Sequence, residues 1–465
     1  MISFLVAAGC ALTAARGDTA SAVLARARHV LGMDDPGILV FTSREATSHA
    51  FESDRMYPPY LSLIDDHRVW LDLATGVERD SLAGPFGQSS VTLSDDHGVS
   101  GQRAAWAATE RERGLEPRLV VHAWSSASDV RVAGRCRYRD YERVVLARNG
   151  TYGPEQLYLD PKTGFVVKLD RVEPHYLWGH VHVEYVYATW LLYGANTFGG
   201  GDVLMPTMST RLVDGEDEIT RSLNDVGHVS RDSAPSLVLP TTGIASTIST
   251  PGFLRPSPVD TVRLGPHAFV LANPGYNEVV TLINDTVYVL DATQGDERAR
   301  TDSQWVARLF PGHHHVNVVV TDVAWPHVSG VRFWAARGAT IISRETSRSF
   351  LERIIEHSGT MRFVPVHSSL VRPGLGLYAI DGIGSEGALM AYLPNDGVLY
   401  ASDYVQTLDG PALYTTEVYA AACRFGLKPS RVVAEHHKVA DWMTLVQVVQ
   451  RQPIGDYPSA CDSRG

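Results

Sequence analysis

Hydrophobic and polar residues alternate along much of the first half of the chain. Residues 68–73 and 179–187 follow this two-residue period, which is typical of half-buried β-strands. Two further alternating runs flank the sequence Asp-Pro-Lys-Thr-Gly at residues 160–164, whose residues favour a turn, so a β-hairpin is predicted over residues 155–169. A helix is predicted at residues 20–31. The pattern over residues 37–230 therefore predicts a large antiparallel sheet.

The pattern changes near residue 260. Residues 233–260 are rich in Ser, Thr, Pro and Gly, a composition typical of linkers. Beyond them, short apolar runs alternate with helical periods. Strands are expected at residues 279–283, 287–291, 317–321, 340–343, 388–393, 397–402 and 431–434. Helices are expected near residues 305–310, with Trp305, Leu309 and Phe310 on one face, and near 331–337, 350–355, 417–425 and from 441.

These patterns predict an α+β protein of two domains. An antiparallel β-rich domain is expected at residues 1–232, a linker at 233–260, and a second domain at 261–465, in which two sheets carry outer helices. The length of 465 residues agrees with two domains, because single cores usually stop growing near 250 to 300 residues.

Composition narrows the class of partner. Hydrophobic residues make up 44% of the chain and charged residues 20%, which is ordinary globular usage. The net charge of −11 argues against a nucleic-acid partner, because binding to phosphate backbones needs a surplus of Lys and Arg. The sequence contains no run of 18 apolar residues, so a membrane-spanning helix is not predicted. A small-molecule substrate or ligand is the expected partner, and the oligomeric state is left open.

The N-terminus and the cysteines leave the compartment open between the cytoplasm and export to the periplasm. Residues 4–15 are apolar, and the sequence Ala-Ala-Gly-Cys at 7–10 resembles a lipoprotein cleavage box, although an ordinary first helix is the alternative. Cys10, Cys136, Cys423 and Cys461 show no C-x-x-C spacing. A Cys423–Cys461 bridge is expected if the protein is exported, and buried free thiols otherwise.

One segment carries the strongest chemical signal. Residues 321–331 read T-D-V-A-W-P-H-V-S-G-V and residues 337–341 read R-G-A-T-I. This frame resembles the metallo-β-lactamase superfamily, in which T-H-x-H-x-D-H is followed by S-G-G, a helix and G-A-x-I/V. The stretch TVYVLDA, ending near Asp291, resembles the strand of the family's structural Asp. The stretch SEGALMAYLPNDGVLYASDYV resembles the hairpin that ends in its metal-bridging Asp, here Asp403.

The resemblance runs from residue 277 to near residue 450 and implies an αββα metallo-β-lactamase sandwich over residues 261–465. The preceding sheet resembles a lipoprotein-carrier half-barrel, on the stretches LDPKTGFVVKLDR and YVYATWLLYGANTFGGGDVLMPTMST. The resemblance therefore implies a half-barrel-like β domain followed by the sandwich.

The family's ligand positions are only partly retained. Its first metal site takes three histidines, and those positions hold Asp322, Ala324 and Gly384. Its second site takes Asp, His, a late His and the bridging Asp, and those positions hold Pro326, His327, His436 and Asp403. The resemblance therefore implies a degenerate site with at most one zinc or iron ion, on His327, Asp403 and His436. The alternative is a site without metal, in which these are hydrogen-bonded loop residues.

Whether the chain is an enzyme is left open by its sequence. The first hypothesis is a metallo-β-lactamase-like hydrolase acting on a small ester, lactone or thioester. Asp322 and His327 would be its catalytic residues, and Trp325, Tyr404 and His437 would bind substrate. His437 could also exchange roles with His436. The alternatives are a non-catalytic ligand-binding or scaffold pseudoenzyme, and a metal-independent lyase or isomerase that uses Asp322 and His327 as an acid/base pair.

Other candidates have ordinary explanations. The tract His313-His314-His315 enters a predicted strand, so its side chains point to opposite faces and a surface role is expected. His180 and His182 share one face of a strand and are expected on a sheet surface. Asp381 and Glu386 flank Gly384, where a turn role is expected ahead of a pocket role. No G-x-S-x-G, P-loop, G-x-G-x-x-G or H-E-x-x-H motif occurs.

Overall fold

The computed structural model divides the chain into two compact units, which are described separately. It describes residues 11–13, 17–34, 37–49, 61–84, 89–95, 98–101, 113–175, 177–194, 198, 202–240, 245–246, 258–273, 275–312, 314–355, 360–381, 387–409, 414–437 and 439–451. Unit 1 comprises Met1–Ser48, Ser62–His175 and Gly179–Gly252. Unit 2 comprises His49–Leu61, Tyr176–Trp178 and Phe253–Gly465.

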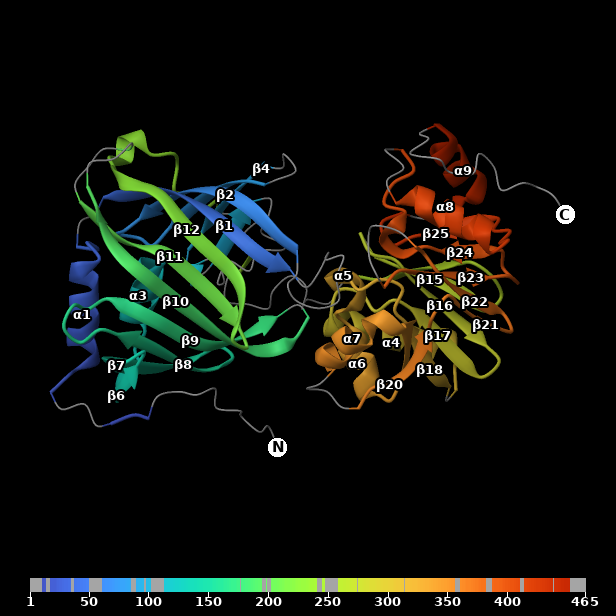
Figure 1. Cartoon of the computed structure of the whole chain (residues 1–465), viewed down its shortest axis with the longest axis horizontal. Coiled ribbons are helices and arrows are strands. Elements are labelled where there is room, and N and C mark those ends of the chain that lie inside the picture. The colour runs from blue at the N-terminus through green and yellow to red at the C-terminus, as the bar shows by residue number, and fades with distance from the viewer. Residues whose placement is uncertain are drawn as a thin grey trace. The chain divides into compact units, whose positions relative to one another are not determined.

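Unit 1 is built on a large antiparallel sheet, as the alternating pattern predicts (Figure 1). The strand order is β13-β5-β4-β3-β2-β1-β12-β11-β10-β9-β8-β7-β6. The strands are β1 (Ile38–His49), β2 (Leu61–Asp72), β3 (Glu78–Ala83), β4 (Ser89–Ser94), β5 (Gly98–Gly101), β6 (Arg131–Tyr138), β7 (Tyr141–Gly150), β8 (Gly153–Leu159), β9 (Val166–His175), β10 (Gly179–Tyr193), β11 (Val203–Val213), β12 (Glu216–Val229) and β13 (Ala245–Ser246).

The predicted hairpin is formed by β8 and β9. Asp160 Oδ1 accepts hydrogen bonds from the backbone N–H groups of Lys162 and Thr163, each at 2.9 Å. Gly164 closes the turn at φ 80°, a conformation that a side chain disfavours. Turn chemistry and alternation together fix this register.

The described part of unit 1 includes the α-helices α1 and α3, and α3 was not predicted. Helix α1 (Ala20–Val30) is confirmed, with the Thr19 hydroxyl accepting a hydrogen bond from Ala22 N at 3.2 Å. Helix α3 (Pro117–Ser126) interrupts the region predicted as strands, and that prediction was wrong here. Pro117 is suited to a first helical turn, and the Glu116 carboxylate caps it by accepting from Arg118 N at 3.1 Å. Leu119 packs into the same apolar cluster as strand residues such as Phe41.

Unit 2 contains two mixed sheets. The seven-stranded sheet runs β14-β15-β16-β17-β18-β19-β20 and is parallel from β17 to β20; the six-stranded sheet runs β21 to β26 in order, with β24 and β25 parallel. The first sheet has β14 (Asp260–Arg263), β15 (Ala268–Ala272), β16 (Glu278–Ile283), β17 (Thr286–Leu290), β18 (His315–Val319), β19 (Thr340–Arg344) and β20 (Arg362–Val366). The second has β21 (Ser369–Arg372), β22 (Leu375–Ala379), β23 (Leu389–Leu393), β24 (Val398–Tyr400), β25 (Arg431–Val433) and β26 (Ala440–Asp441).

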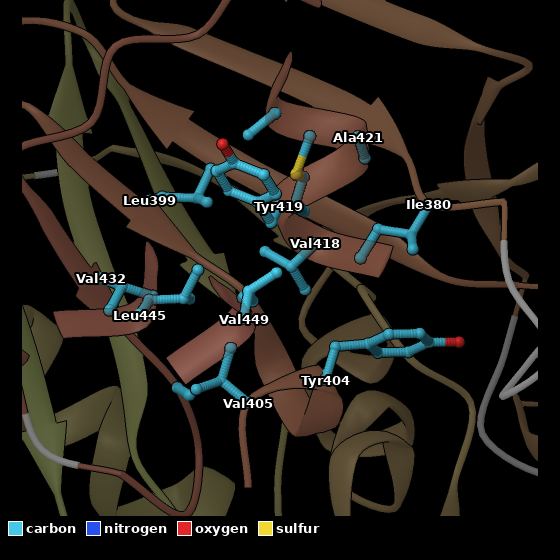
Figure 2. Packing of buried hydrophobic residues seen from close by; sticks show 14 of the residues in the cluster. Ile380, Leu399, Tyr404, Val405, Val418, Tyr419, Ala421, Val432, Leu445 and Val449 are labelled. Atoms are coloured by element: carbon cyan, nitrogen blue, oxygen red, sulfur yellow. The ribbon is translucent and has the colours of Figure 1, made fainter. Parts of the chain in front are cut away.

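The two sheets of unit 2 share a core. One apolar cluster joins residues of the first sheet, such as Leu290 and Val319, to residues of the second, such as Leu389. A second cluster, seen in Figure 2, packs helices α8 (Thr415–Arg424) and α9 (Trp442–Arg451) against the second sheet through Leu399, Val418 and Val449. Helices α4 (Asp296–Leu309), α6 (Val331–Ala336) and α7 (Arg348–Ile355) gather beside the first sheet (Figure 1).

The buried face of α4 differs from the prediction. Trp305 and Leu309 are partly exposed, whereas the helix buries Arg298, Ala299, Asp302 and Val306. Apolar spacing alone misplaced this face, because Arg298 and Asp302 compensate each other's charge one turn apart. Only Phe310, the residue after the helix, is buried as expected.

The described cysteines are not free thiols. Cys136 and Cys423 are both disulfide-bonded, which corrects the expectation of free thiols at these two positions. Cys10 and Cys461 lie outside the described residues, as does most of the apolar segment at residues 4–15. Thr13, at its end, forms a β-bridge with Arg135. No described helix is long and apolar enough to cross a membrane.

Candidate metal centre

The loops that follow four strands of unit 2 bring together six ionisable side chains. Asp291 follows β17, Asp322 and His327 follow β18, Asp403 follows β24, and Glu435 and His436 follow β25. Because β17 and β18 are parallel, as are β24 and β25, each pair delivers its carboxyl ends to one edge. Parallel pairing within each sheet, and the packing of the two sheets in one core, together gather residues more than 140 positions apart in the sequence.

Asp291 ties three of these segments together. Its side chain is fully buried and accepts hydrogen bonds from Thr321 N at 2.7 Å and from the hydroxyls of Thr321, Tyr400 and Ser402 at 2.6, 2.9 and 3.0 Å. Asp291 adopts a φ of 68°, which asparagine and aspartate tolerate better than most residues. It therefore fixes the positions from which the neighbouring loops leave.

His327 is held from one side by a carboxylate. Its Nδ1 lies 2.5 Å from Glu435 Oε2 and 3.3 Å from the Ser402 hydroxyl, while its Nε2 lies 3.9 Å from Asp403 Oδ2. The ring is 1% exposed. Its backbone carbonyl accepts from Ala292 N at 3.0 Å. The imidazole therefore presents Nε2 toward Asp403.

His436 has a matching orientation. Its Nδ1 lies 2.6 Å from the carbonyl oxygen of Gly275, and its Nε2 lies 2.9 Å from Asp403 Oδ1. The ring of Tyr276 contacts it edge-on, with centroids 4.8 Å apart. The Asp403 carboxylate thus stands between the Nε2 atoms of two histidines, so the structure brings His327, Asp403 and His436 together.

Glu435 is the site residue that the sequence did not reveal. One ligand atom from each of His327, Glu435 and His436 lies within 4.8 Å of the others. Its side chain is fully buried, and Asn277 holds its segment by donating to the carbonyls of Ala434 and His437 at 3.2 and 3.3 Å. In the sequence, only its position directly before His436 pointed to this glutamate.

Burial and charge shift the ionisation of the centre. Burial raises the pKa of Asp322 to about 6, with the charges of Asp403 and Asp291 adding to the effect and His327 opposing it. Burial likewise raises the pKa of Glu435 to about 7, against the effect of His327. For Asp403, burial raises the pKa. The hydrogen bond from His436 and the charge of His327 lower it by more, so the pKa lies below its ordinary value. The site thus holds four carboxyl groups and two imidazoles.

Asp322→Asn is expected to stabilise the chelated protein at pH 8 by about 3 kcal/mol and to leave its stability at pH 4 nearly unchanged. The folded-state pKa of Asp322, about 6, lies above the unfolded value, so the wild type loses stability as the pH rises from about 4 through 6. Asparagine escapes this loss and keeps an oxygen that can accept from Ala324 N, now bonded at 2.9 Å. Urea unfolding with a chelator present, at both pH values, measures the difference. Equal stability of the two proteins at pH 8 would contradict it.

Of the three proposed substrate-binding residues, the structure describes the side chains of Tyr404 and His437. Tyr404 is 3% exposed, and its hydroxyl has no hydrogen-bond partner among the described residues. Figure 2 shows this hydroxyl directed away from the packed apolar side chains. Burial and the Asp322 charge raise its pKa, so the phenol remains a proton donor. Trp325 begins helix α5 (Trp325–Val328), but its side chain, like that of Pro326, lies outside the described part. His437 is partly buried.

The weaker candidates occupy ordinary positions. His314 Nδ1 lies 2.7 Å from Asp285 Oδ1, and His315 begins β18; His313 lies outside the described residues. Asp381 pairs with Arg424, while Gly384 and Glu386 also lie outside them. His182 falls beside Asp170 and Glu184 in a second cluster of possible metal ligands.

Lys168 occupies that second cluster. Its Nζ lies 2.9 Å from Asp170 Oδ1 and 3.2 Å from Glu184 Oε1, and it approaches the faces of Tyr138 and Tyr158. The ammonium group already supplies the positive charge that two carboxylates on neighbouring strands need. This cluster is therefore an ion-pair network of the sheet.

Comparisons with known proteins find similarity in structure alone. No family model and no curated protein matches the chain. Solved structures that resemble part of it include the DIM-1 metallo-β-lactamase exposed to ceftazidime, at 15% identity, covering 41% of this chain and 95% of that one with a TM-score of 0.34. A metallo-β-lactamase from Hirschia baltica is 17% identical and covers 41% and 96%, also with a TM-score of 0.34. FIM-1 from Pseudomonas aeruginosa, in its mono-zinc form, is 14% identical and covers 42% and 96%, again at 0.34. At this TM-score the likeness assigns neither activity nor ligands to the chain.

Proposed function

We propose that unit 2 is a metallo-β-lactamase-type sandwich that holds one divalent ion, zinc or iron, through His327, Asp403 and His436. The observation that carries this is the convergence of both Nε2 atoms on the Asp403 carboxylate, at 2.9 and 3.9 Å. Tetrahedral zinc ligands with bonds near 2.1 Å stand about 3.4 Å apart, which lies between these distances. A small lengthening of the shorter contact and a small shortening of the longer one would complete a three-ligand site with an open position.

The groups behind the histidines support this assignment. Metal-binding histidines usually give their other ring nitrogen to a carboxylate or a backbone carbonyl. Glu435 fills that role for His327 Nδ1, and the Gly275 carbonyl fills it for His436 Nδ1. Each Nε2 atom is therefore left to face the Asp403 carboxylate, that of His327 toward Oδ2 and that of His436 toward Oδ1.

The charge balance also fits a cation. Asp403 Oδ1 and Glu435 Oε2 are buried oxygens that contact imidazoles without a hydrogen bond of regular geometry. Buried carboxylates without full partners are costly, and either protons or a cation must offset them. A divalent ion would displace the protons now held by the His327–Glu435 pair, so its affinity should rise with pH.

The proposed reaction is hydrolysis of a small ester, lactone or thioester. A bound divalent ion supplies Lewis-acid chemistry, which polarises a carbonyl oxygen and acidifies water. Asp322, with a pKa of about 6, is largely ionised at pH 7.5 and can accept a proton as general base. The neutral Tyr404 phenol can donate a hydrogen bond to a substrate oxygen. Trp325 and His437 complete the proposed substrate contacts.

The test is turnover of an aryl acetate, a γ-lactone and an acyl thioester by protein loaded with Zn²⁺ or Fe²⁺. At least one substrate should be hydrolysed above the rate of a chelated sample, and activity should return on adding the ion. Asp322→Asn should bind the ion but lose roughly 100-fold or more in kcat, as expected for loss of a general base. Protein that binds the ion yet hydrolyses none of the three classes would contradict the hydrolase proposal and leave a ligand-binding pseudoenzyme.

A second candidate function is a metal-independent lyase or isomerase. It is favoured by the pKa values of Asp322, about 6, and Glu435, about 7, which suit proton transfer near neutrality without an ion. This candidate predicts activity that a chelator does not reduce. Activity that is lost when a chelator removes the ion would contradict this candidate.

We also propose that the protein works in an oxidising compartment, such as the periplasm. Disulfide bonds at both described cysteines support this, because stable disulfides are rare in the reducing cytoplasm. Protein purified from its native cells and treated with a thiol-alkylating reagent before reduction should show no alkylated Cys136 or Cys423. Full alkylation of either cysteine would contradict the proposal.

A further inference from the structure

Unit 1 contains a cavity that the proposed hydrolase site does not use. It has a volume of about 340 Å³ and lies between helix α3 and strands β7, β8 and β9. Leu119, Val120, Ala123 and Trp124 line it from α3, and the β7–β8 turn at residues 148–151 lines it from the sheet. This volume falls at the lower end of pockets that hold small organic ligands.

The cavity lining has a formal excess of one positive charge, although the net charge of the chain is −11. Arg113, Arg148 and Arg171 line it, against two acidic residues, Asp95 and Glu155. An excess of guanidinium groups at a partly enclosed surface favours a ligand with an anionic group. Arg171 also pairs with Glu173 outside the lining, so the donors available to a ligand come mainly from Arg148.

Arg148 is held in place by contacts that leave one of its donor groups unused. Its Nε lies 2.6 Å from Glu155 Oε2, its Nη1 donates to the Ala123 carbonyl at 3.2 Å, and its guanidinium lies 4.7 Å from the Trp124 ring centre. Its Nη2 makes no hydrogen bond to any described residue. A guanidinium carries five N–H donors, so Nη2 can bind a carboxylate or phosphate oxygen.

Trp124 adds an apolar surface and an unused donor. The side chain is 1% exposed, and its indole N–H has no acceptor among the described residues. Buried donors without partners are uncommon and often mark the place of a water or ligand. With Leu119 and Leu169, the ring also gives the cavity a wall suited to an apolar or aromatic body.

We propose that this cavity binds a small organic anion, with a carboxylate or phosphate head at Arg148 and a short apolar or aromatic body against Trp124. The head would take the Nη2 donors in a charge-assisted hydrogen bond. The proposal is independent of the metal centre. It gives unit 1 a ligand-binding role of its own.

Calorimetric titration of the full chain tests this with two matched probes, 4-phenylbutyrate and the neutral 4-phenylbutan-1-ol. The acid should bind at least about tenfold more tightly than the alcohol, because only the acid can form the charge-assisted bond to Arg148. Arg148→Gln should weaken binding of the acid by about tenfold and leave the alcohol unaffected.

A second pair of variants tests the place of binding. Ala123→Phe fills the cavity from α3 and should abolish binding of the acid. Ser125→Phe adds the same ring to an exposed position of the same helix outside the lining, and should bind as the wild type does. Thermal unfolding confirms that each variant is folded. Equal affinity for acid and alcohol, no binding of the acid at millimolar concentration, or wild-type affinity in folded Ala123→Phe would overturn the proposal.

Discussion

Asp403→Asn is expected to reduce the affinity of the protein for Zn²⁺ by more than about 100-fold, because second-sphere partners of a metal site alone contribute 10- to 100-fold. The Asp403 carboxylate lies between the Nε2 atoms of His327 and His436. Asparagine keeps the shape but removes the anionic charge that both imidazoles and an ion would share. Titration against a competing chelator measures the affinity, and hydrolysis by the loaded protein should fall in parallel.

Two further variants sharpen this result. Asp409→Asn removes a carboxylate from an exposed position six residues away and should bind Zn²⁺ as the wild type does. Glu435→Gln removes only the charge behind His327 and should weaken binding by about 10- to 100-fold. Asp403→Asn protein that is folded and binds the ion as tightly as Asp409→Asn would exclude Asp403 as a ligand.

Arg298→Leu is expected to destabilise unit 2 by about 3 to 5 kcal/mol, the usual cost of leaving a buried charge without its partner. Arg298 is fully buried in α4. Its Nε lies 2.9 and 2.8 Å from the two Asp302 oxygens, and its Nη groups donate to the carbonyls of Tyr276 and Leu271 at 3.2 and 3.0 Å. Its removal would leave Asp302 beside Glu278, whose pKa burial and Asp302 already raise well above the ordinary value. Hydrogen exchange of amides in α4 and β16 at increasing urea measures the loss.

The matched control is the double variant Arg298→Leu with Asp302→Leu. It replaces the pair with apolar side chains of similar size and should recover most of the lost stability. If the double variant were as unstable as Arg298→Leu alone, packing and the two lost carbonyl contacts, not the charge of Asp302, would explain the effect.

The sequence predicted those helices and strands whose formation depends mainly on neighbouring residues. The hairpin at residues 155–169 follows from alternation and from Asp160 and Gly164 in the turn. The parallel strands β17 to β19 follow from compact apolar runs. Helix α3 was missed because it lies among strands, and a single capping Glu116 followed by Pro117 is a weak start signal in that context. The edge strand β14 was missed because an exposed strand carries little apolar signal, and the short buried strand β15 beside it was missed as well.

The metal centre was predictable only in part. The family-like spacing placed His327 and Asp403 in loops after strands, and the structure brings them together with His436. Glu435 occupies no ligand position of the family pattern, so only the fold reveals its contact with His327. The buried Arg298–Asp302 pair was hidden for a related reason, since charged residues in a helix are ordinarily assigned to its exposed face.

The metal content of the purified wild-type protein tests the central claim most directly. We would measure it by inductively coupled plasma mass spectrometry after dialysis, without an affinity tag that itself binds metal. We expect about one zinc or iron atom per chain, since one set of three ligands supports one ion, and we expect its loss in Asp403→Ala. Protein that is reproducibly metal-free, and that takes up no ion when dialysed against Zn²⁺ or Fe²⁺, would contradict the account.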